Sequence, residues 1–342
     1  MLGRPKAPRP IFSRRRHSLR LPISWIIIGL LVLLFWLVPV YGTPLDFIPG
    51  LTLPAFQVTI PPTPTRTPKP PPAHGGRIAF TCTRGGFNQL CIINADGSDL
   101  QQLSADLSAN DYYPSFMPEG DALLFASNRN GPFDIYLMVF GQRTLLQITS
   151  GVGNAASPDF SPDGKQIVFV NRPADGPPAI WMVDRDGSDP HLFYAGPNPI
   201  VSVAWSPDGR TIAYAMQVDV PTEYEIFLIG VDGSNLHRLT NGLHGIGGSV
   251  SWSPDSSSLL IYAGPVGGRD IYRLEAQSGA ATQLTHGGNN AAPSYSPDGK
   301  YIVFNSSRNN NQADLFIMNW DGSSQRQLTS DPEPDWQPRW EP

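Results

Sequence analysis

The chain has 342 residues, of which 36 are proline and 33 glycine, while only 15% are charged. This composition favours an all-β protein with many turns over a helical protein with charged outer faces. Seven basic residues and no acid precede residue 21, so the rest of the chain carries 17 basic against 29 acidic residues, a net charge of −12. Nucleic acid is therefore excluded as an expected partner, because phosphate binding needs a basic surface.

The basic tail 1–20 precedes an uncharged apolar run at 21–41. Its 21 residues match the roughly 20 that cross a bilayer as a helix. The basic flank predicts a cytoplasmic N-terminus and an extracytoplasmic remainder. A cleaved secretory signal is the alternative, but the run exceeds the usual core of about 7–15 residues and no small-x-small cleavage pattern follows. We therefore expect a single-pass signal-anchor helix in the cell membrane.

A Pro/Thr-rich linker follows at 42–74, and its stretch 61–72 reads PPTPTRTPKPPP. In the polyproline II conformation, at ~3.1 Å per residue, this stretch would span roughly 37 Å. We interpret it as an extended spacer that separates the membrane from a domain at 75–342. The alternative is a docking segment for an aromatic groove on a partner.

The remaining chain is a repeat. An aromatic residue followed two positions later by proline recurs at spacings of 43 to 47 residues: Phe116, Phe160, Trp205, Trp252, Tyr295 and Trp340. In the fifth of these periods, the turn Ser296–Gly299 leads to the apolar triplet Ile302–Phe304, a third apolar segment, an Asp-Gly turn and Leu328-Thr329. Four short strands in a period of about 40–45 residues indicate a β-propeller blade. Six periods predict a six-bladed β-propeller with four-stranded antiparallel blades.

These motifs also resemble a known family. The Ser-Pro-Asp-Gly turn, the Ile-Ala-Phe strand and the Asp-Gly-Ser…Leu-Thr ending resemble the TolB-type, or PD40, WD40-like propeller repeat over roughly residues 76–342. Met117–Gly120, Ser253–Ser256 and Phe140-Gly141 depart from the pattern in single turns. The resemblance implies a binding module for an envelope protein or a cell-wall glycan, although some related propellers are enzymes.

The two ends of the repeat region are complementary. The first period begins after its aromatic strand, at Arg77, and the chain stops just after supplying such a strand at 337–340. We therefore expect the first blade to combine the C-terminal strand with three strands from 77–103. This arrangement closes the ring and hides two sheet edges that would otherwise pair with other chains.

Cys82 and Cys91 are the two cysteines, and they fall on consecutive predicted strands with the turn 85–88 between them. Cross-strand neighbours of this kind lie close enough to bond. Outside the cytoplasm we expect a disulfide, and the alternative is a pair of buried free thiols.

Signals for catalysis, metals or cofactors are weak. The chain contains neither Gly-x-Ser-x-Gly nor His-Glu-x-x-His. Asp184–Asp189 superficially resembles a calcium-binding loop. An EF-hand loop needs a bidentate glutamate eleven residues after its first ligand, where this chain has Ala195, and the segment coincides with a repeated hairpin turn. We predict no cofactor, no metal site and no catalytic residue.

The loops that join each fourth strand to the next first strand should ring one mouth of a central channel. Their candidate binding residues are Asp111, Tyr112, Asn154, Asn198, His244, Asn289, Asn290, Asp335 and Trp336. Amides, carboxylates and aromatics suit a protein or glycan partner, whereas the alternative is that Asn and Asp serve the turns. His244 and His286 are the two histidines in such loops.

The expected protein is a monomeric, membrane-anchored, extracytoplasmic propeller that binds an envelope protein or a cell-wall glycan without catalysis. The competing hypothesis is an extracytoplasmic polysaccharide lyase or hydrolase that uses residues at the channel mouth.

Overall fold

The computed structural model describes residues 76–342 except 107, 143, 219–222 and 310–311. The predicted tail 1–20, membrane helix 21–41 and linker 42–74 lie outside these residues. Within the part that is described, no helix has the length and hydropathy that crossing a bilayer requires.

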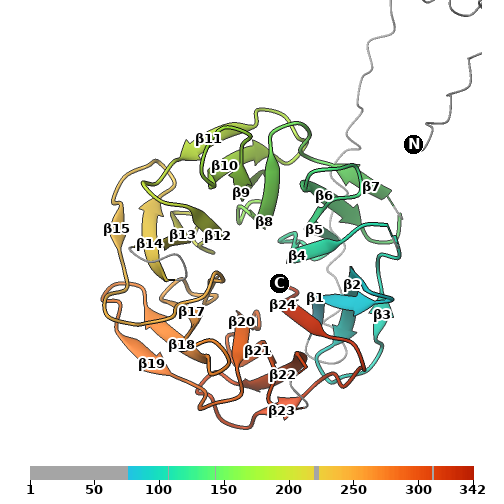
Figure 1. Ribbon diagram of the computed structural model, residues 1–342, viewed down its shortest axis with the longest axis vertical. Helices are drawn as coiled ribbons and strands as arrows, with labels where there is room; N and C mark the ends of the chain where they lie inside the picture. Colours follow the sequence, from blue (N-terminus) through green and yellow to red (C-terminus); the bar gives the residue numbers. More distant parts are fainter. Residues whose placement is uncertain (1–75, 107, 143, 219–222, 310–311) are drawn as a thin grey trace, which may run out of the picture. The chain divides into compact units, whose positions relative to one another are not determined.

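Six four-stranded antiparallel sheets form a ring, as Figure 1 shows. Blade 1 contains β24 (Asp335–Trp340), β1 (Arg77–Arg84), β2 (Phe87–Asn94) and β3 (Gln101–Gln102). Blade 2 contains β4 (Asp111–Phe116), β5 (Ala122–Ser127), β6 (Asp134–Val139) and β7 (Thr144–Gln147). Blade 3 contains β8 (Asn154–Phe160), β9 (Gln166–Arg172), β10 (Ala179–Asp184) and β11 (His191–Tyr194).

The other half of the ring repeats this order. Blade 4 contains β12 (Ile200–Trp205), β13 (Thr211–Gln217), β14 (Tyr224–Gly230) and β15 (His237–Arg238). Blade 5 contains β16 (Ser251–Trp252), β17 (Ser258–Ala263), β18 (Asp270–Glu275) and β19 (Ala281–Gln283). Blade 6 contains β20 (Asn290–Tyr295), β21 (Tyr301–Ser306), β22 (Asp314–Asn319) and β23 (Arg326–Gln327). The predicted six-bladed architecture is confirmed.

The C-terminal strand closes the ring as predicted. β24 pairs with β1 in a register that sets Ile78 opposite Trp340. Beyond the strand, the Glu341 N–H donates to the Arg77 carbonyl at 2.8 Å. The Arg77 guanidinium donates to both carboxylate oxygens of Glu341, at 2.9 and 2.6 Å. The two ends of the propeller are thus joined by a sheet and by an ion pair.

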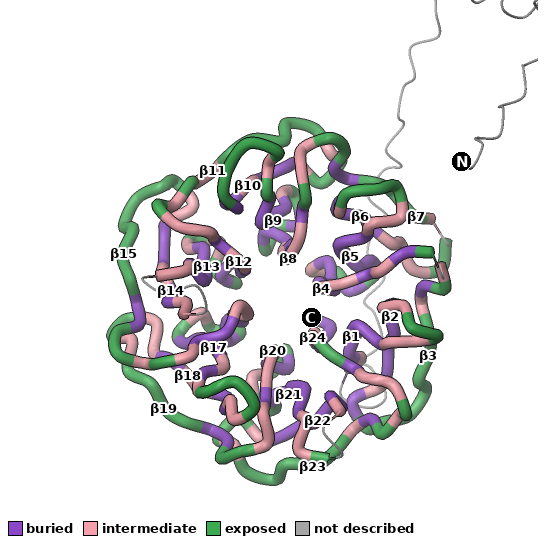
Figure 2. The backbone as a smooth tube through the Cα atoms, viewed as in Figure 1, coloured by how far each residue is buried: buried purple, intermediate pink, exposed green. Residues whose placement is uncertain are grey.

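The hydrophobic core is divided into six clusters, one at each contact between neighbouring blades. The aromatic residue of each period packs against the preceding blade and is at most 9% exposed. Trp340, for example, shares its cluster with Val303 and Leu315 of blade 6 and stacks on Tyr301 with ring centroids 6.3 Å apart. Figure 2 shows buried residues within the blades and exposed ones along the outer strands.

The repeated motifs hold single blades together. In the turn between β20 and β21, the Ser296 hydroxyl donates to Asp298 at 2.7 Å and accepts from the Tyr301 N–H at 2.9 Å. The Leu-Thr ending binds the third strand: the Leu315 N–H donates to the Thr329 hydroxyl at 3.0 Å. The same bond recurs from Ile135, Ile226 and Ile271 to Thr149, Thr240 and Thr285.

Cys82 of β1 and Cys91 of β2 are joined by a disulfide, with a Cα–Cα distance of 5.8 Å. The strand register sets Phe80 opposite Cys91 and Cys82 opposite Gln89, so the two cysteines are diagonal neighbours. The bond lies inside the blade that the C-terminal strand completes.

Candidate ligand-binding site

The first strand of each blade lines the centre of the ring and runs between two faces. It starts at the face that carries the loops from the preceding blade, which we call the mouth face. It ends at the face that carries the Ser-Pro-Asp-Gly turns, which we call the turn face. The candidate site lies toward the mouth face, because most of its inner-strand residues stand three or four positions before the aromatic, and Tyr262 and Asn305 lie near the ends of second strands.

Four of the inner strands contain the same β-bulge. In β4, β8, β20 and β24, the register with the second strand shifts shortly before the aromatic residue. Between the fourth and the first position before the aromatic, the inner strand contains one residue more than the second strand. The residue at the bulge has a positive φ and is followed by proline: Tyr113 (57°), Ser157 (50°), Ala292 (49°) and Gln337 (52°). Since a bulge re-aims side chains, it redirects this position toward the channel.

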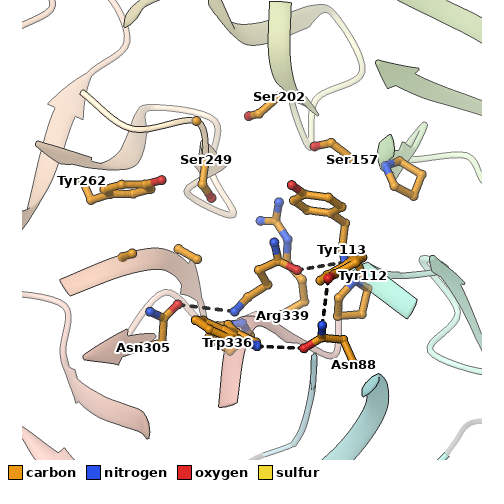
Figure 3. Close-up of a pocket in the computed structure, with 17 residues that line it drawn as sticks. Asn88, Tyr112, Tyr113, Ser157, Ser202, Ser249, Tyr262, Asn305, Trp336 and Arg339 are labelled. Atoms are coloured by element: carbon orange, nitrogen blue, oxygen red, sulfur yellow. Dashed lines mark hydrogen bonds between the residues drawn. The ribbon is translucent and has the colours of Figure 1, made fainter. Parts of the chain in front are cut away.

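The residues three positions before the aromatic form a ring with one member from each blade. They are Tyr113, Ser157, Ser202, Ser249, Ala292 and Gln337. All six line a pocket of about 380 Å³ in the centre of the propeller, and Figure 3 shows several of their side chains around it. The volume falls within the range of about 300–1,000 Å³ that is usual for ligand pockets.

Aromatic side chains stand at the edge of this pocket. The Trp336 side chain is 37% exposed, and its indole N–H donates to the Asn88 amide oxygen at 3.4 Å. The Asn88 amide N–H donates in turn to the Tyr112 hydroxyl at 2.8 Å. This chain of hydrogen bonds, drawn in Figure 3, fixes Trp336 and Tyr112 on neighbouring blades.

Tyr262 closes another side of the pocket. Its ring lies against the backbone of Gly247, where an added Cβ would come within 1.8 Å of a ring carbon. The Arg269 guanidinium lies over the same ring, 5.3 Å from its centroid. Burial raises the pKa of the Tyr262 phenol, so it remains a neutral hydrogen-bonding group in the wall.

Arg339 supplies the positive charge of the pocket. It directly precedes Trp340 in β24, is partly buried, and points its guanidinium into the channel in Figure 3. Among the residues that the structure describes, none forms a hydrogen bond or an ion pair with the Arg339 guanidinium. Burial lowers its pKa and the charge of Asp159 raises it, but an arginine stays protonated under such conditions.

Asp159 holds the equivalent position in β8, directly before Phe160. Its carboxylate accepts hydrogen bonds from the Ser115 hydroxyl and from the Trp205 N–H, both at 2.8 Å. Burial raises the pKa of this carboxyl group, and the charge of Arg339 lowers it. Asp159 is thus occupied by protein donors and does not line the pocket.

Two of the residues predicted from the mouth loops, Tyr112 and Trp336, reach the pocket. Three others are buried beneath it at the first position of an inner strand. Asp111 accepts from Arg129 at 3.0 and 3.2 Å, and Asn290 accepts from Arg308 at 2.9 Å. Asp335 pairs with Arg84 at 3.5 Å, and burial raises its pKa to about 7.

The other predicted residues lie outside the pocket lining. Asn154 is exposed and accepts from the Phe133 N–H at 3.2 Å. His244 is exposed and lies 3.9 Å from Glu223. Asn198 and Asn289 are partly buried, and His286 is exposed. We do not carry these residues or the three buried ones into the proposed site.

Sequence reasoning missed most of the pocket, including Arg339 and the ring serines. A signal was present in four periods, because a proline stands two positions before the aromatic residue: Pro114, Pro158, Pro293 and Pro338. Proline removes a ladder donor, so its recurrence inside an inner strand indicates a bulge.

The composition of the pocket lining defines what it can offer a ligand. Its described lining contains no Asp, Glu, His or Cys, and no group of three such residues elsewhere in the described chain is arranged to hold a metal ion. The lining instead offers hydroxyls, amides, aromatic rings and one guanidinium.

Comparisons with known proteins agree with this architecture. An uncharacterized protein of Agrobacterium fabrum is 37% identical over 194 residues, which cover 54% of this chain and 62% of the relative. The solved TolB of Acinetobacter baumannii superposes with a TM-score of 0.69 at 23% identity, covering 78% of this chain and 67% of that one. An oligogalacturonate lyase from Vibrio parahaemolyticus superposes with a TM-score of 0.53 at 14% identity, covering 75% of each chain.

The two structural likenesses show the fold alone, and the matches to curated relatives span only 35 to 62% of the length of those relatives. The family model described as the TolB beta propeller domain, PD40, matches residues 64–176 and 177–342, which is most of the chain. The chain belongs to the TolB beta-propeller (PD40) family.

Proposed function

We propose that this protein is a non-catalytic binding module, anchored in the cell membrane with its propeller on the extracytoplasmic side. It holds part of an envelope protein or a cell-wall glycan in the channel pocket. The observation that carries the proposal is the ring of six side chains, one from each blade, around a pocket of about 380 Å³. A site assembled from all six blades is held rigidly, because every blade is fixed by its two neighbours.

The lining supports binding by its composition. Tyrosine, tryptophan and arginine are the side chains that dominate recognition surfaces. Trp336 and Tyr112 are held in place by Asn88 before any ligand arrives, and a preformed site loses less conformational entropy on binding.

The first described residue lies away from the pocket. The described chain begins at Gly76 beside Trp340, on the turn face, where a Cβ would come within 2.8 Å of the indole nitrogen. The pocket lies toward the opposite, mouth face, so the segment at Gly76 does not obstruct it. The membrane anchor in the proposal rests on the apolar run 21–41 and the basic residues before it.

A lyase or hydrolase would need a general acid or base within reach of its substrate. Asp159 is the acid whose charge acts on Arg339, and it is bonded to Ser115 and Trp205 instead of lining the pocket. The remaining titratable groups of the lining are tyrosines and an arginine. We therefore favour binding over catalysis.

The test compares two exposed tryptophans in the full chain, each replaced by the photo-crosslinking residue p-benzoylphenylalanine in intact cells. Trp336 stands at the pocket, and Trp320, which is 49% exposed, stands on the turn face. We expect adducts from position 336, read by mass spectrometry, and their loss when Ser249→Trp fills the pocket. Adducts from position 320 alone, or adducts at 336 that survive Ser249→Trp in a normally melting protein, would contradict the proposal.

A further inference from the structure

The residues directly before the aromatic of each period occupy equivalent places around the ring. They are Ser115, Asp159, Ala204, Ser251, Ser294 and Arg339. Among them, Arg339 alone belongs to the described pocket lining. The repeat therefore provides a small residue or the hydrogen-bonded Asp159 at five of these places, and a guanidinium that lines the pocket at one.

Three other arginines on the mouth side have side-chain partners. Arg84 pairs with Asp331 at 2.8 Å, Arg129 with Asp111 at 3.0 Å, and Arg308 donates to Asn290 at 2.9 Å. Arg339 lacks such a contact within the described residues. A guanidinium carries five N–H donors in a planar fork, so its donors remain available to a ligand.

An unpaired charge in a half-buried site is unfavourable unless a partner compensates it. Asp159 compensates this charge only in part, because it forms no hydrogen bond with the guanidinium and each of its oxygens accepts a bond from Ser115 or Trp205. The group that fits the guanidinium fork best is a second carboxylate, which accepts two parallel hydrogen bonds.

The apolar part of the lining favours a peptide over a sugar as the source of that carboxylate. Pro114, Pro158, Pro338, Ala291 and Ala292 offer no side-chain hydrogen bonds. Any ring hydroxyl of a uronic acid that faced these five side chains would be left unpaired, which is costly. An Asp or Glu side chain brings apolar methylenes and a single charged end.

We propose that the pocket recognises an acidic side chain of a partner protein, whose carboxylate is bound by Arg339 while Trp336 and Tyr112 contact the flanking peptide. The negative charge of Asp159 offsets part of the positive charge of Arg339 and so weakens the attraction for a carboxylate. Binding is therefore limited to acidic peptides that also contact Trp336 and Tyr112. The inference rests on the proposed function and adds the chemical class of the ligand.

The probe is a phage-displayed library of random heptapeptides, selected on the full chain and sequenced. We expect the parent to enrich peptides that contain Asp or Glu. Arg339→Gln should reduce this enrichment at least about tenfold, because a charge-assisted, bidentate pair is lost. Arg339→Lys should retain part of it, and Asp159→Asn should increase it. Arg210→Gln removes the same charge from an exposed turn-face residue and should change nothing.

The outcomes separate the two proposals. Peptides that bind equally to the parent and Arg339→Gln but are lost in Ser249→Trp would overturn the acidic ligand and leave the binding pocket standing. Peptides that Ser249→Trp does not affect would count against both. In a parallel arm, trigalacturonate that binds through Arg339, with no acidic peptide enriched, would replace the protein partner by a glycan. Thermal melts of each variant check that lost binding is not lost folding.

Discussion

Two positions on the inner strands lie two residues apart and serve different purposes. The position five residues before the aromatic holds Asp111, Asn290 and Asp335, which are fully buried and bonded to arginines at the ends of second strands. The position three before the aromatic forms the ring around the pocket, because a bulge turns it toward the channel. Polar residues on one strand are thus divided between structure and recognition by their burial and partners, not by their type.

The largest effect is expected from removing the buried aromatic residue at the end of an inner strand, because both positions belong to the strand that this residue holds in place. Trp340→Ala should destabilise the propeller by about 3–5 kcal/mol, since it empties a buried aromatic site. That is a large part of the ~5–15 kcal/mol that a folded protein has in total. The measurement is a thermal melt of the full chain, with Trp320→Ala as a control on an exposed tryptophan. Equal melts for the two variants would mean that the C-terminal strand does not close the ring.

The fold was predictable because its determinants are local. Each Ser-Pro-Asp-Gly turn is closed by bonds within five residues, as between Ser296 and Tyr301, and the aromatic spacing alone gives the number of blades. Closure followed from the same register, since Trp340 supplies the aromatic that the first period lacks.

The site was less predictable because its determinants are not local. Asp111 and Asp335 have the composition of loop residues, but partners 18 and 251 residues away bury them. The ring of residues three positions before the aromatic depends on how the inner strand pairs with the second strand. In the sequence, only the recurring prolines indicate the bulge. Arg339 is distinctive because its guanidinium lines the pocket without a side-chain partner among the described residues, and no sequence pattern displays that.

The stability of the propeller should depend on pH through the buried position five residues before the aromatic, because in blade 1 this position holds a carboxyl group with a raised pKa. Asp335 has a pKa of about 7 in the folded state, against about 3.9 when unfolded. The folded state therefore binds the proton more tightly, and this stabilisation is lost as pH rises through 7.

Between pH 5 and 8, the parent should lose about 2 kcal/mol of stability relative to Asp335→Asn, as measured by denaturant unfolding at each pH. Asp232→Asn is the control: hydrogen bonds from Ser234 lower the pKa of this exposed carboxyl group, so it stays ionised throughout. Parallel stability curves for the parent and Asp335→Asn would show that Asp335 is not a buried proton-binding group.

The most direct test of the division between structure and recognition compares two arginines by thermal melting. Arg129 is held by Asp111 and by the Ser127 hydroxyl at 2.9 Å, whereas Arg339 has no such contact among the described residues. Arg129→Gln should cost about 3 kcal/mol, because it leaves a buried carboxylate unpaired. Arg339→Gln should leave the melting temperature unchanged or raise it. If Arg339→Gln destabilises the propeller as much as Arg129→Gln does, Arg339 is a structural residue and its guanidinium is not reserved for a ligand.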